Sequence, residues 1–283
     1  MIPSSSPEAE SIGPQTPRVS VVIVSFNRAA ALRNCIELLE GMHQVVVVDN
    51  GSTDGSAGIG DDFPAVRLMR LPKNFGLTKA LNIGLRAAEG EYILCLHDDA
   101  RISGESVTRM ADFLEARADV GAVCPLLTDE SGDPVPQVRE LPGPAAPDPP
   151  LRPATGGEEI EAACVSGAAF MFRAFFLRAL RQIDERYGTY GSEIELCAQM
   201  RRAGKKIAIL RGVPGIHEFS ASAAPENALQ GDRVTGTAVF LAKHHGFLAS
   251  LLYRLKSGLI ALLTFRFNVV AAAFGGQKID GTG

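Results

Sequence analysis

The first half of the chain alternates β-branched apolar runs with segments of helical periodicity, and this order limits the folds it can adopt. Five runs are typical of strands, the first two of them of buried strands: residues 19–24, 44–49, 66–71, 91–96 and 120–124. Three segments between or after them have helical spacing: about 28–40, 77–89 and 103–117. Because consecutive parallel strands need a crossover that a helix supplies, this order predicts an α/β fold. We expect a mostly parallel, Rossmann-like sheet flanked by helices.

Composition excludes several classes of protein. Among 283 residues, 46% are hydrophobic and 21% are charged, which fits a globular chain and excludes a disordered or fibrous one. The net charge of -4 disfavours a nucleic-acid-binding protein, so no nucleic-acid partner is expected. The five cysteines contain no CxxC pair and mostly lie in apolar runs. They predict buried, reduced thiols in a cytoplasmic protein rather than a zinc site or disulfides.

The chain divides into five parts by composition. They are a disordered Ser/Pro-rich tail (1–17), the first half of the α/β domain (18–127), a Pro-rich insertion (128–160), the second half (161–230) and a helical extension (231–283). We find neither an export signal in the tail nor a stretch of 18 uncharged apolar residues, so a transmembrane helix is not expected.

The insertion and the second half are less regular than the first half. Eight prolines between Pro134 and Pro153 exclude an ordinary helix or central strand, and we interpret the insertion as a mobile loop over or beside the active site, in contact with the acceptor. The pattern after it predicts strands at 162–173 and 206–210, helices at 192–203 and 232–245, and His217 in a loop.

Polar residues follow four of the predicted strands, at 25–28, 49–52, 73–76 and 97–99. In open parallel sheets, ligands bind outside the carboxyl ends of the strands, so these residues are expected to share one site. The doublet Asp98-Asp99 suits a divalent cation that also binds phosphate, although such a doublet often caps a following helix. The chain has no P-loop, no GxGxxG after the first strand and no GxSxG elbow.

Six stretches, in this order, resemble the family 2 inverting glycosyltransferases of GT-A fold, and the later ones resemble their rhamnosyltransferase-like branch. They are VSVVIVSFNRAAAL (19–32), VVVVDNGSTDGS (45–56), NFGLTKALNIGLRAAEGEYILCLHDDA (74–100), VSGAAFMFR (165–173), YGSEIELCAQMRRAGKKI (190–207) and PGIHEFSAS (214–222). The resemblance implies a GT-A nucleotide-sugar-binding fold over about residues 18–222, followed by a C-terminal helical extension.

The resemblance assigns the nucleotide-sugar site residue by residue. Asp49 corresponds to the aspartate that contacts the base or ribose, with a simple turn-forming role as the alternative. The backbone around Ser25, Phe26 and Asn27 would pack on the nucleoside. Lys73 and Asn74 correspond to residues near the phosphates or the sugar, and an exposed loop is the alternative for both.

The metal site follows from the same resemblance. His97-Asp98-Asp99 stands at the family's DXD-like position, where Asp99 would bind Mn²⁺ or Mg²⁺ and Asp98 would face the ribose or donor sugar. His97 occupies a position where many members have Asp or Asn, and an imidazole can also bind Mn²⁺. His217 corresponds to a histidine that completes the metal site, while an ordinary surface histidine is the alternative.

The catalytic base is expected at Glu193. Family members typically have Glu-Asp-x-Asp-Leu where this chain has Ser-Glu-Ile-Glu-Leu (192–196), so Glu193 is one methylene longer than the usual base. A carboxylate there can accept the proton of the acceptor hydroxyl. Ser192 and Glu195 match a capping box, Ser-x-x-Glu, which gives Glu195 a structural role and leaves Glu193 available.

The C-terminal segment 247–274 is apolar and carries Arg254, Lys256 and Arg266 without an acidic residue. It fits a helix lying on an anionic membrane surface, or equally a helix pair packed on the catalytic domain or across a homodimer. Membrane contact would place the protein at the inner face of the membrane and suit a lipid-linked acceptor.

Together these features predict a metal-assisted inverting glycosyltransferase. It would move a sugar from a dTDP- or UDP-sugar to a hydroxyl of a glycan, lipid-linked saccharide or small molecule, as in polysaccharide biosynthesis. A non-catalytic nucleotide-sugar-binding or scaffold protein on the same frame is the alternative, since His97, Ser192 and Glu193 depart from the family pattern. A nucleotidyltransferase is disfavoured because SFNRAAAL (25–32) stands where its Gly-rich loop would be.

Overall fold

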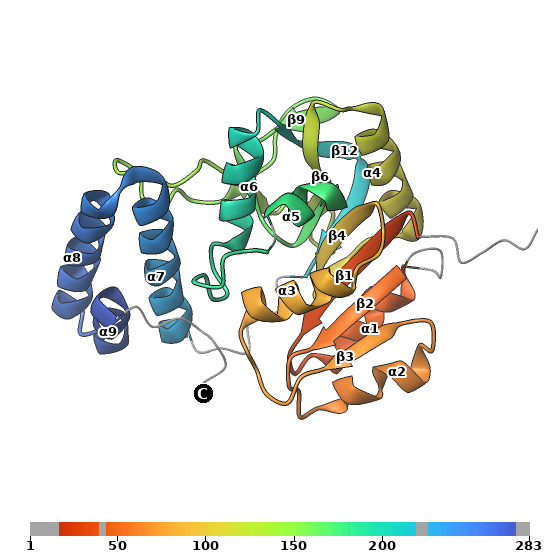
Figure 1. Ribbon diagram of the computed structural model, residues 1–283, viewed down its shortest axis with the longest axis horizontal. Coiled ribbons are helices and arrows are strands. Elements are labelled where there is room, and N and C mark those ends of the chain that lie inside the picture. The colour runs from red at the N-terminus through yellow and green to blue at the C-terminus, as the bar shows by residue number, and fades with distance from the viewer. Residues whose placement is uncertain (1–16, 40–43, 181, 219–225, 276–283) are drawn as a thin grey trace, which may run out of the picture.

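A computed structural model describes residues 17–39, 44–180, 182–218 and 226–275 (Figure 1). Its centre is a nine-stranded sheet with the order β3-β2-β1-β4-β11-β6-β12-β5, and β9 pairs with β12 outside this path. The first four strands are parallel: β1 (Val19–Ser25), β2 (Gln44–Asp49), β3 (Arg67–Arg70) and β4 (Tyr92–His97). Their carboxyl ends therefore lie along one edge, as the sequence predicts.

The other half of the sheet is mixed. β11 (Ala169–Arg173) runs antiparallel to both β4 and β6 (Val120–Thr128). β12 (Lys206–His217) is parallel to β6 and antiparallel to β5 (Ala100–Arg101). The predicted helix-flanked α/β sheet is confirmed, and the reversal of β11 is the feature that the strand pattern did not reveal.

Helices cover both faces of the sheet. On one face α1 (Ala29–Glu37) and α4 (Gly104–Ala116) bury apolar side chains against the strands, near the short η1 (Gly55–Gly58) and α2 (Ile59–Asp62). The opposite face carries α3 (Leu77–Ala87), α5 (Ala174–Leu180) and α6 (Ser192–Arg202). The strands β1, β2, β4 and β6 are buried on both sides, which explains their continuous apolar runs, whereas β3 is exposed or half-buried.

The Pro-rich insertion has more regular structure than its composition predicts. β7 (Pro136–Arg139), β8 (Arg152–Pro153) and β10 (Cys164–Val165) form a three-stranded sheet, and β9 (Glu159–Glu161) pairs with β12 of the main sheet. The prediction that this insertion holds no central strand is therefore wrong for β7, the middle strand of that sheet, while its mobility and its contact with the acceptor stay predictions. Pro153 lies in the edge strand β8, where a missing N–H costs no ladder bond, whereas Pro136 begins the middle strand β7, at a register irregularity in its pairing with β8.

Three further sequence predictions need correction. The strand expected at 162–173 is divided into β10 and β11 by a turn at 166–168. His217 ends β12 instead of lying in a loop, because β12 continues well past residue 210 to pair with β5. The capping box is absent: α6 begins at Ser192, and its N-cap is Gly191, whose φ of 107° favours glycine.

The C-terminal extension is a group of three helices that stands beside the α/β domain at the left of Figure 1: α7 (Glu226–His245), α8 (Phe247–Leu263) and α9 (Phe267–Gly275). Within the described residues, no helix is both long and apolar enough to cross a bilayer. All five cysteines are buried and free, as predicted. The predicted tail lies almost wholly in residues 1–16, outside the described residues.

Candidate functional site

The loops after β1 and β2 are tied to each other by short hydrogen bonds. The Asn27 N–H donates to Ser52 Oγ at 2.9 Å, and Asn27 Oδ1 accepts from the Thr53 N–H at 2.8 Å. The buried Asp49 accepts from the Ser52 N–H at 2.9 Å through Oδ1, and Arg70 Nε lies 3.8 Å from its Oδ2. These contacts hold the two strand ends in one geometry before any ligand binds.

Asn50 extends this framework to the loop after β3. Its Nδ2 donates to Asn74 Oδ1 at 2.9 Å, and its Oδ1 accepts from the Phe75 N–H at 2.9 Å. Gly51 has a φ of 84°, and a Cβ built there would lie 2.4 Å from the carbonyl carbon of Lys73. The loops after β2 and β3 pass so close to each other that only glycine fits at position 51, directly after Asp49 and Asn50.

The first carboxylate of the doublet is held by the end of β1. Ser25 Oγ donates to Asp98 Oδ2 at 2.8 Å, and Arg28 Nη1 lies 3.3 Å from Asp98 Oδ1. Burial raises the pKa of the Asp98 carboxyl, while Ser25 and Arg28 act in the opposite direction. Asp98 therefore lies within the framework of the strand ends, beside the region expected to hold the nucleotide sugar.

His97, Asp99 and His217 form a cluster with the character of a metal site. One ligand atom from each residue lies within 4.8 Å of the others. His217 Nε2 is 3.2 Å from Asp99 Oδ1, and His97 Nδ1 is 3.8 Å from the same oxygen. Two imidazoles and a carboxylate are a donor set that suits Mn²⁺ and related divalent ions, so the residues present fit the predicted metal.

The pairing of β5 with β12 creates this cluster. His217 is opposite Ala100, the residue after Asp99, and the Glu218 N–H donates to the Asp99 carbonyl at 3.0 Å. The pKa of His97 is lowered to about 4: burial is the largest cause, the charges of His217 and Arg28 act in the same direction, and the charge of Asp99 opposes them. A neutral imidazole is the form that binds a metal ion.

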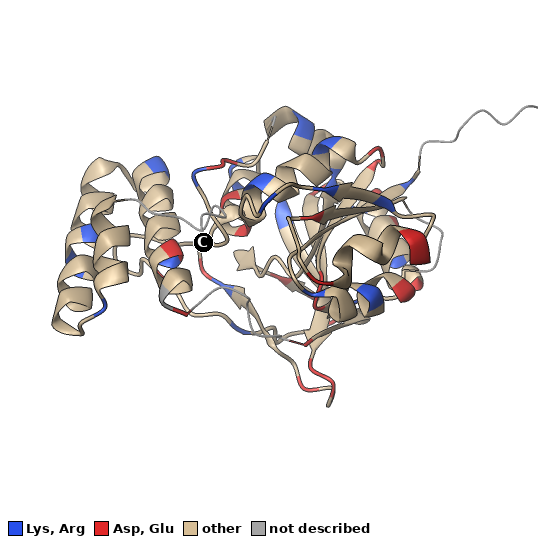
Figure 2. Ribbon diagram, turned by 90° about the horizontal axis from the view of Figure 1, so that it is seen from below, with Lys and Arg blue, Asp and Glu red and all other residues tan. Residues whose placement is uncertain are grey.

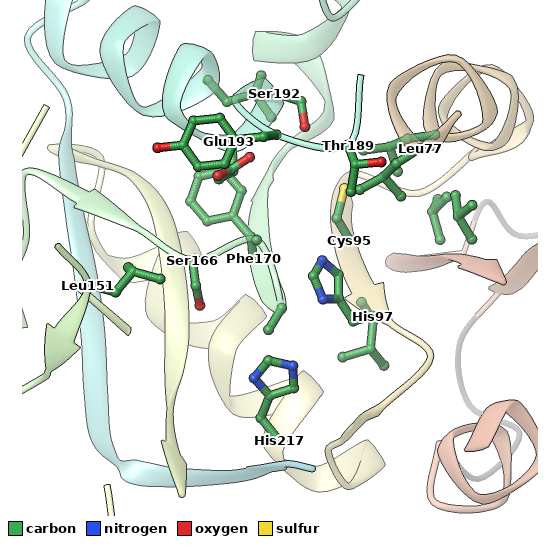
Figure 3. A pocket seen from close by; sticks show the side chains of 18 of the residues that line it. Leu77, Cys95, His97, Leu151, Ser166, Phe170, Thr189, Ser192, Glu193 and His217 are labelled. Carbon is green, nitrogen blue, oxygen red and sulfur yellow. The ribbon is translucent and has the colours of Figure 1, made fainter. Parts of the chain in front are cut away.

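A cavity of about 290 Å³ opens beside the cluster, between the sheet, α3 and α6 (Figure 3). His97, His217 and Glu193 all line it, and most of its other lining residues are apolar. Gly167 lies between two of them: a Cβ built there would be 3.4 Å from Glu193 Cβ and 3.7 Å from His97 Nε2. The predicted base and two predicted metal ligands thus share one cavity.

Glu193 lies in the first turn of α6. Its Oε2 accepts from the Gly191 N–H at 3.3 Å. Burial raises the pKa of its carboxyl, and the nearby Arg139 acts in the opposite direction. A carboxylate with a raised pKa at a cavity is suited to accept a proton.

The chain matches the sequence profile described as "Glycosyl transferase family 2" over residues 20–181, which is more than half of its length. It belongs to this family. A curated relative, the glycosyltransferase GlyG of Streptococcus pneumoniae, is 35% identical over 111 residues, which are 36% of this chain and 37% of GlyG. The matched part is thus only about a third of that relative's length.

Two solved structures share the fold of this chain. The S. aureus TarS fragment 1–349 with UDP-GlcNAc has a TM-score of 0.63 at 17% identity, covering 90% of this chain and 79% of TarS. The mannosyltransferase PcManGT from Pyrobaculum calidifontis, with GDP-Man and Mn²⁺, has a TM-score of 0.56 at 16% identity, covering 93% of this chain and 88% of PcManGT. The predicted family and GT-A fold are confirmed.

The structure places the predicted site residues in two groups. Three of them line the cavity: His97, Glu193 and His217. The others are not among its lining residues: Ser25, Phe26, Asn27, Asp49, Lys73, Asn74, Asp98 and Asp99. Asp99 connects the two groups through its contacts with the two histidines. The Lys73 backbone lies against Gly51 in the strand-end loops, and its ammonium is 5.4 Å from the Phe75 ring centroid.

Sequence reasoning missed three residues of the site. Arg28 Nη1 lies 3.0 Å from Asp99 Oδ2, and it was within the motif that resembles the family. Asn50, next to Asp49, supports the loops. Arg139, from the Pro-rich insertion, lines the cavity and donates to Tyr190 Oη at 2.6 Å. No local signal marked Arg139, because its place depends on the pairing of β7 with β10.

Proposed function

We propose that this family 2 glycosyltransferase transfers a sugar from a nucleoside-diphosphate sugar to an acceptor hydroxyl, with inversion at C1. The observation that carries the proposal is the common cavity of Glu193 and the histidines of the His97–Asp99–His217 cluster. An inverting single displacement needs a base for the incoming hydroxyl and positive charge near the leaving diphosphate. Glu193 suits the first task, and a metal ion held by the His97–Asp99–His217 cluster would suit the second.

The strand-end loops would bind the nucleotide. Asp49 lies at the end of β2, beside the loop that Asn27 and Ser52 join, and it would accept hydrogen bonds from the base or ribose. Asp98, beside Ser25, would face the ribose or the donor sugar. The backbone of Ser25, Phe26 and Asn27 would pack on the nucleoside, with Lys73 and Asn74 near the phosphates. Because hydrogen bonds already hold the loops, little ordering would be needed on binding.

His97, Asp99 and His217 would hold Mn²⁺ or Mg²⁺, which supplies positive charge for the diphosphate. Arg28, 3.0 Å from Asp99, would add a fixed positive charge at the same place. PcManGT was solved with Mn²⁺ and GDP-Man, which supports a metal-dependent donor site.

Glu193 would orient the acceptor hydroxyl and accept its proton. The carboxylate lines the cavity on the side of α6, across Gly167 from His97, so an acceptor in the cavity would lie between base and donor. The apolar lining favours an acceptor with an apolar part, such as a lipid-linked saccharide. We propose a dTDP- or UDP-sugar as donor, and the UDP-GlcNAc complex of TarS supports the UDP alternative.

Calorimetry with UDP, dTDP and GDP, each with and without Mn²⁺, tests the donor site. We expect metal-dependent binding of one nucleotide and a loss of at least about tenfold in Asp99→Asn, since a carboxylate ligand is removed. Asp61→Asn, at an exposed acidic residue of α2, is the matched control and should bind like the wild type. Absence of binding for all three nucleotides would contradict the proposal.

Incubation of the metal-loaded protein with the corresponding sugar nucleotide separates an enzyme from a scaffold. Hydrolysis of the donor at the wild-type site, lost in Asp99→Asn, is expected of the enzyme. Tight nucleotide binding with neither hydrolysis nor transfer would favour the non-catalytic alternative.

A further inference from the structure

The helical extension presents a broad apolar surface. Of the large hydrophobic side chains that are exposed among the described residues, most belong to α8, α9 and the corner between them: Phe247, Leu248, Leu251, Leu252, Leu255, Leu259, Ile260, Leu262, Leu263, Phe265, Phe267 and Phe274. Phe247 is 76% exposed and Phe265 is 80% exposed, at opposite ends of α8. A surface of this size usually marks an interaction site.

The inner face of α8 is already occupied by its neighbours. Ser250 Oγ donates to the Ala238 carbonyl of α7 at 2.8 Å. Gly258 lies against α9 so closely that a Cβ there would be 2.6 Å from the Phe274 ring. The outer face, which carries Leu248, Leu252 and Leu255, repeats at intervals of three and four residues and continues through Leu259 and Leu262. It is therefore a separate face, opposite the one that packs.

The charge around this face has a single sign. Residues 247–275 contain Arg254, Lys256 and Arg266 and no Asp or Glu. Arg254 donates to the Ala273 carbonyl at 2.8 Å and so ties α8 to α9. Lys256 and Arg266 are exposed beside the apolar side chains. Figure 2 shows blue but no red on α8 and α9.

We propose that α8 and the α8–α9 corner lie on an anionic lipid surface, with Leu252, Leu255 and Leu259 in the acyl boundary and Lys256 at the headgroups. A row of apolar side chains along one face of a helix, flanked by lysine and arginine, is typical of helices that lie at a membrane surface. This inference does not rest on the proposed glycosyl transfer.

A second copy of the chain fits the face less well. In a twofold interface, each surface meets itself, so the Lys256 and Arg266 of one copy would approach those of the other without an acidic partner in 247–275. The exposed side chains also extend around the corner to Phe265 and Phe267, beyond one helix-wide stripe. Anionic lipid headgroups would supply the negative charge that Lys256 and Arg266 lack in such a dimer. A lipid layer would also cover the full width of the apolar surface.

Co-sedimentation with vesicles, without nucleotide or metal, tests the proposal on the full chain. We expect binding to phosphatidylcholine vesicles that contain phosphatidylglycerol, and weaker binding to phosphatidylcholine alone. The triple variant Leu252→Ser/Leu255→Ser/Leu259→Ser should lower the partition coefficient by about three orders of magnitude, because it removes three leucines that the lipid would bury. Circular dichroism and nucleotide calorimetry show whether it remains folded.

Two comparisons keep the test specific. Lys256→Glu should weaken binding to the anionic vesicles by about 30-fold, since it changes two unit charges at the surface. Arg178→Glu, at an exposed residue of α5, is its matched control, and Phe175→Ser, an exposed phenylalanine of the same helix, is the control for lost apolar surface. Both controls should bind as the wild type does.

Three results would overturn the proposal. These are no binding to anionic vesicles by the wild type, equal binding by the wild type and both test variants, or a concentration-dependent dimer that the triple variant abolishes. The last result, measured by light scattering without lipid, would assign the face to a second copy. Nucleotide binding is measured separately without vesicles, so failure of the donor site and failure of the lipid surface are distinguishable.

Discussion

At the scale of single residues, the two carboxylates at 193 and 195 have different environments although both belong to α6. Glu193 lines the cavity, and burial raises the pKa of its carboxyl. Burial acts in the same direction on Glu195, but hydrogen bonds from Lys243, Gln199 and His244 outweigh it and lower that pKa to about 2. One carboxylate is thus suited to exchange a proton, and the other to remain ionised.

Glu193→Gln tests the proposed base. We expect kcat to fall by about 10²–10⁴-fold, because an amide cannot accept the hydroxyl proton, while nucleotide affinity changes less than about twofold. Glu193→Asp, which keeps the carboxylate, should retain more activity than the glutamine variant. Steady-state kinetics and calorimetry on the three proteins measure this, and near-normal kcat in Glu193→Gln would contradict the assignment.

The pH profile of the wild type gives an independent measure of the same group. The base works only when ionised, so kcat/KM, which reports the pKa values of the free enzyme, should rise with pH as Glu193 loses its proton. Because burial raises its pKa, the midpoint should lie above the ordinary glutamate value of 4.5. The rising limb should disappear from the residual activity of Glu193→Gln.

At the scale of elements, the site depends on how closely the loops between strands approach each other. Gly51 illustrates this, since its φ of 84° and the 2.4 Å approach of the Lys73 backbone both exclude a side chain. Gly132 has a similar φ of 88°, but nothing lies within 4 Å of its Cβ position. Substitution of Gly132 therefore tests the cost of the backbone conformation alone, whereas substitution of Gly51 adds the cost of a steric clash.

Gly132→Ala should lower the free energy of unfolding by about 1–2 kcal/mol, the cost of a left-handed conformation for alanine. Gly51→Ala should lower it by at least about 1 kcal/mol more, because the β2 loop must also move away from Lys73. Urea unfolding measures both variants. Only Gly51→Ala should weaken nucleotide binding, and equal effects of the two substitutions would show that the loops are not tightly apposed.

At the scale of the whole molecule, the helical extension is joined to the α/β domain next to the proposed base. Asp232 of α7 accepts from the Thr189 and Tyr190 N–H groups at 2.8 and 2.7 Å, just before α6. At the other end of α7, Lys243 Nζ and His244 Nε2 lie 2.8 and 2.7 Å from the Glu195 carboxylate. Contacts from two places on α7, at Asp232 and at its C-terminal end, thus hold the start of α6.

Glu195 makes this junction sensitive to acid. Its folded-state pKa is depressed, so its contribution is present above pH 4.5 and is lost as the pH falls toward about 2. We expect this loss to be on the order of 2 kcal/mol of unfolding free energy, after allowing for solvent screening. Glu195→Gln should lack this part of the pH dependence and be less stable at neutral pH by a similar amount.

Chemical unfolding of wild type, Glu195→Gln and Glu105→Gln across this pH range measures the effect. Glu105 is an exposed glutamate of α4, so its variant should follow the wild-type curve within about 0.5 kcal/mol. A Glu195→Gln curve parallel to the wild type would show that the junction does not depend on this charge.

Local sequence patterns specify the elements of the first half and the strand-end position of Asp49, Asp98 and Asp99. Local periodicity is enough there, because strands buried on both faces alternate with helices and their polar ends meet at one edge. The family motifs added Glu193 and His217 as candidates, but their roles in catalysis and metal binding stay predictions.

How distant residues come into contact depends on the pairing of elements far apart in the sequence. His217 reaches Asp99 because β12 pairs with β5, a contact across 118 residues that no local pattern specifies. Arg139 reaches the cavity through β7, and Glu195 is tied to α7 instead of capping α6. Long-range pairing and burial override local preferences because side-chain packing and charge pairing across the fold contribute more free energy than a cap or a turn.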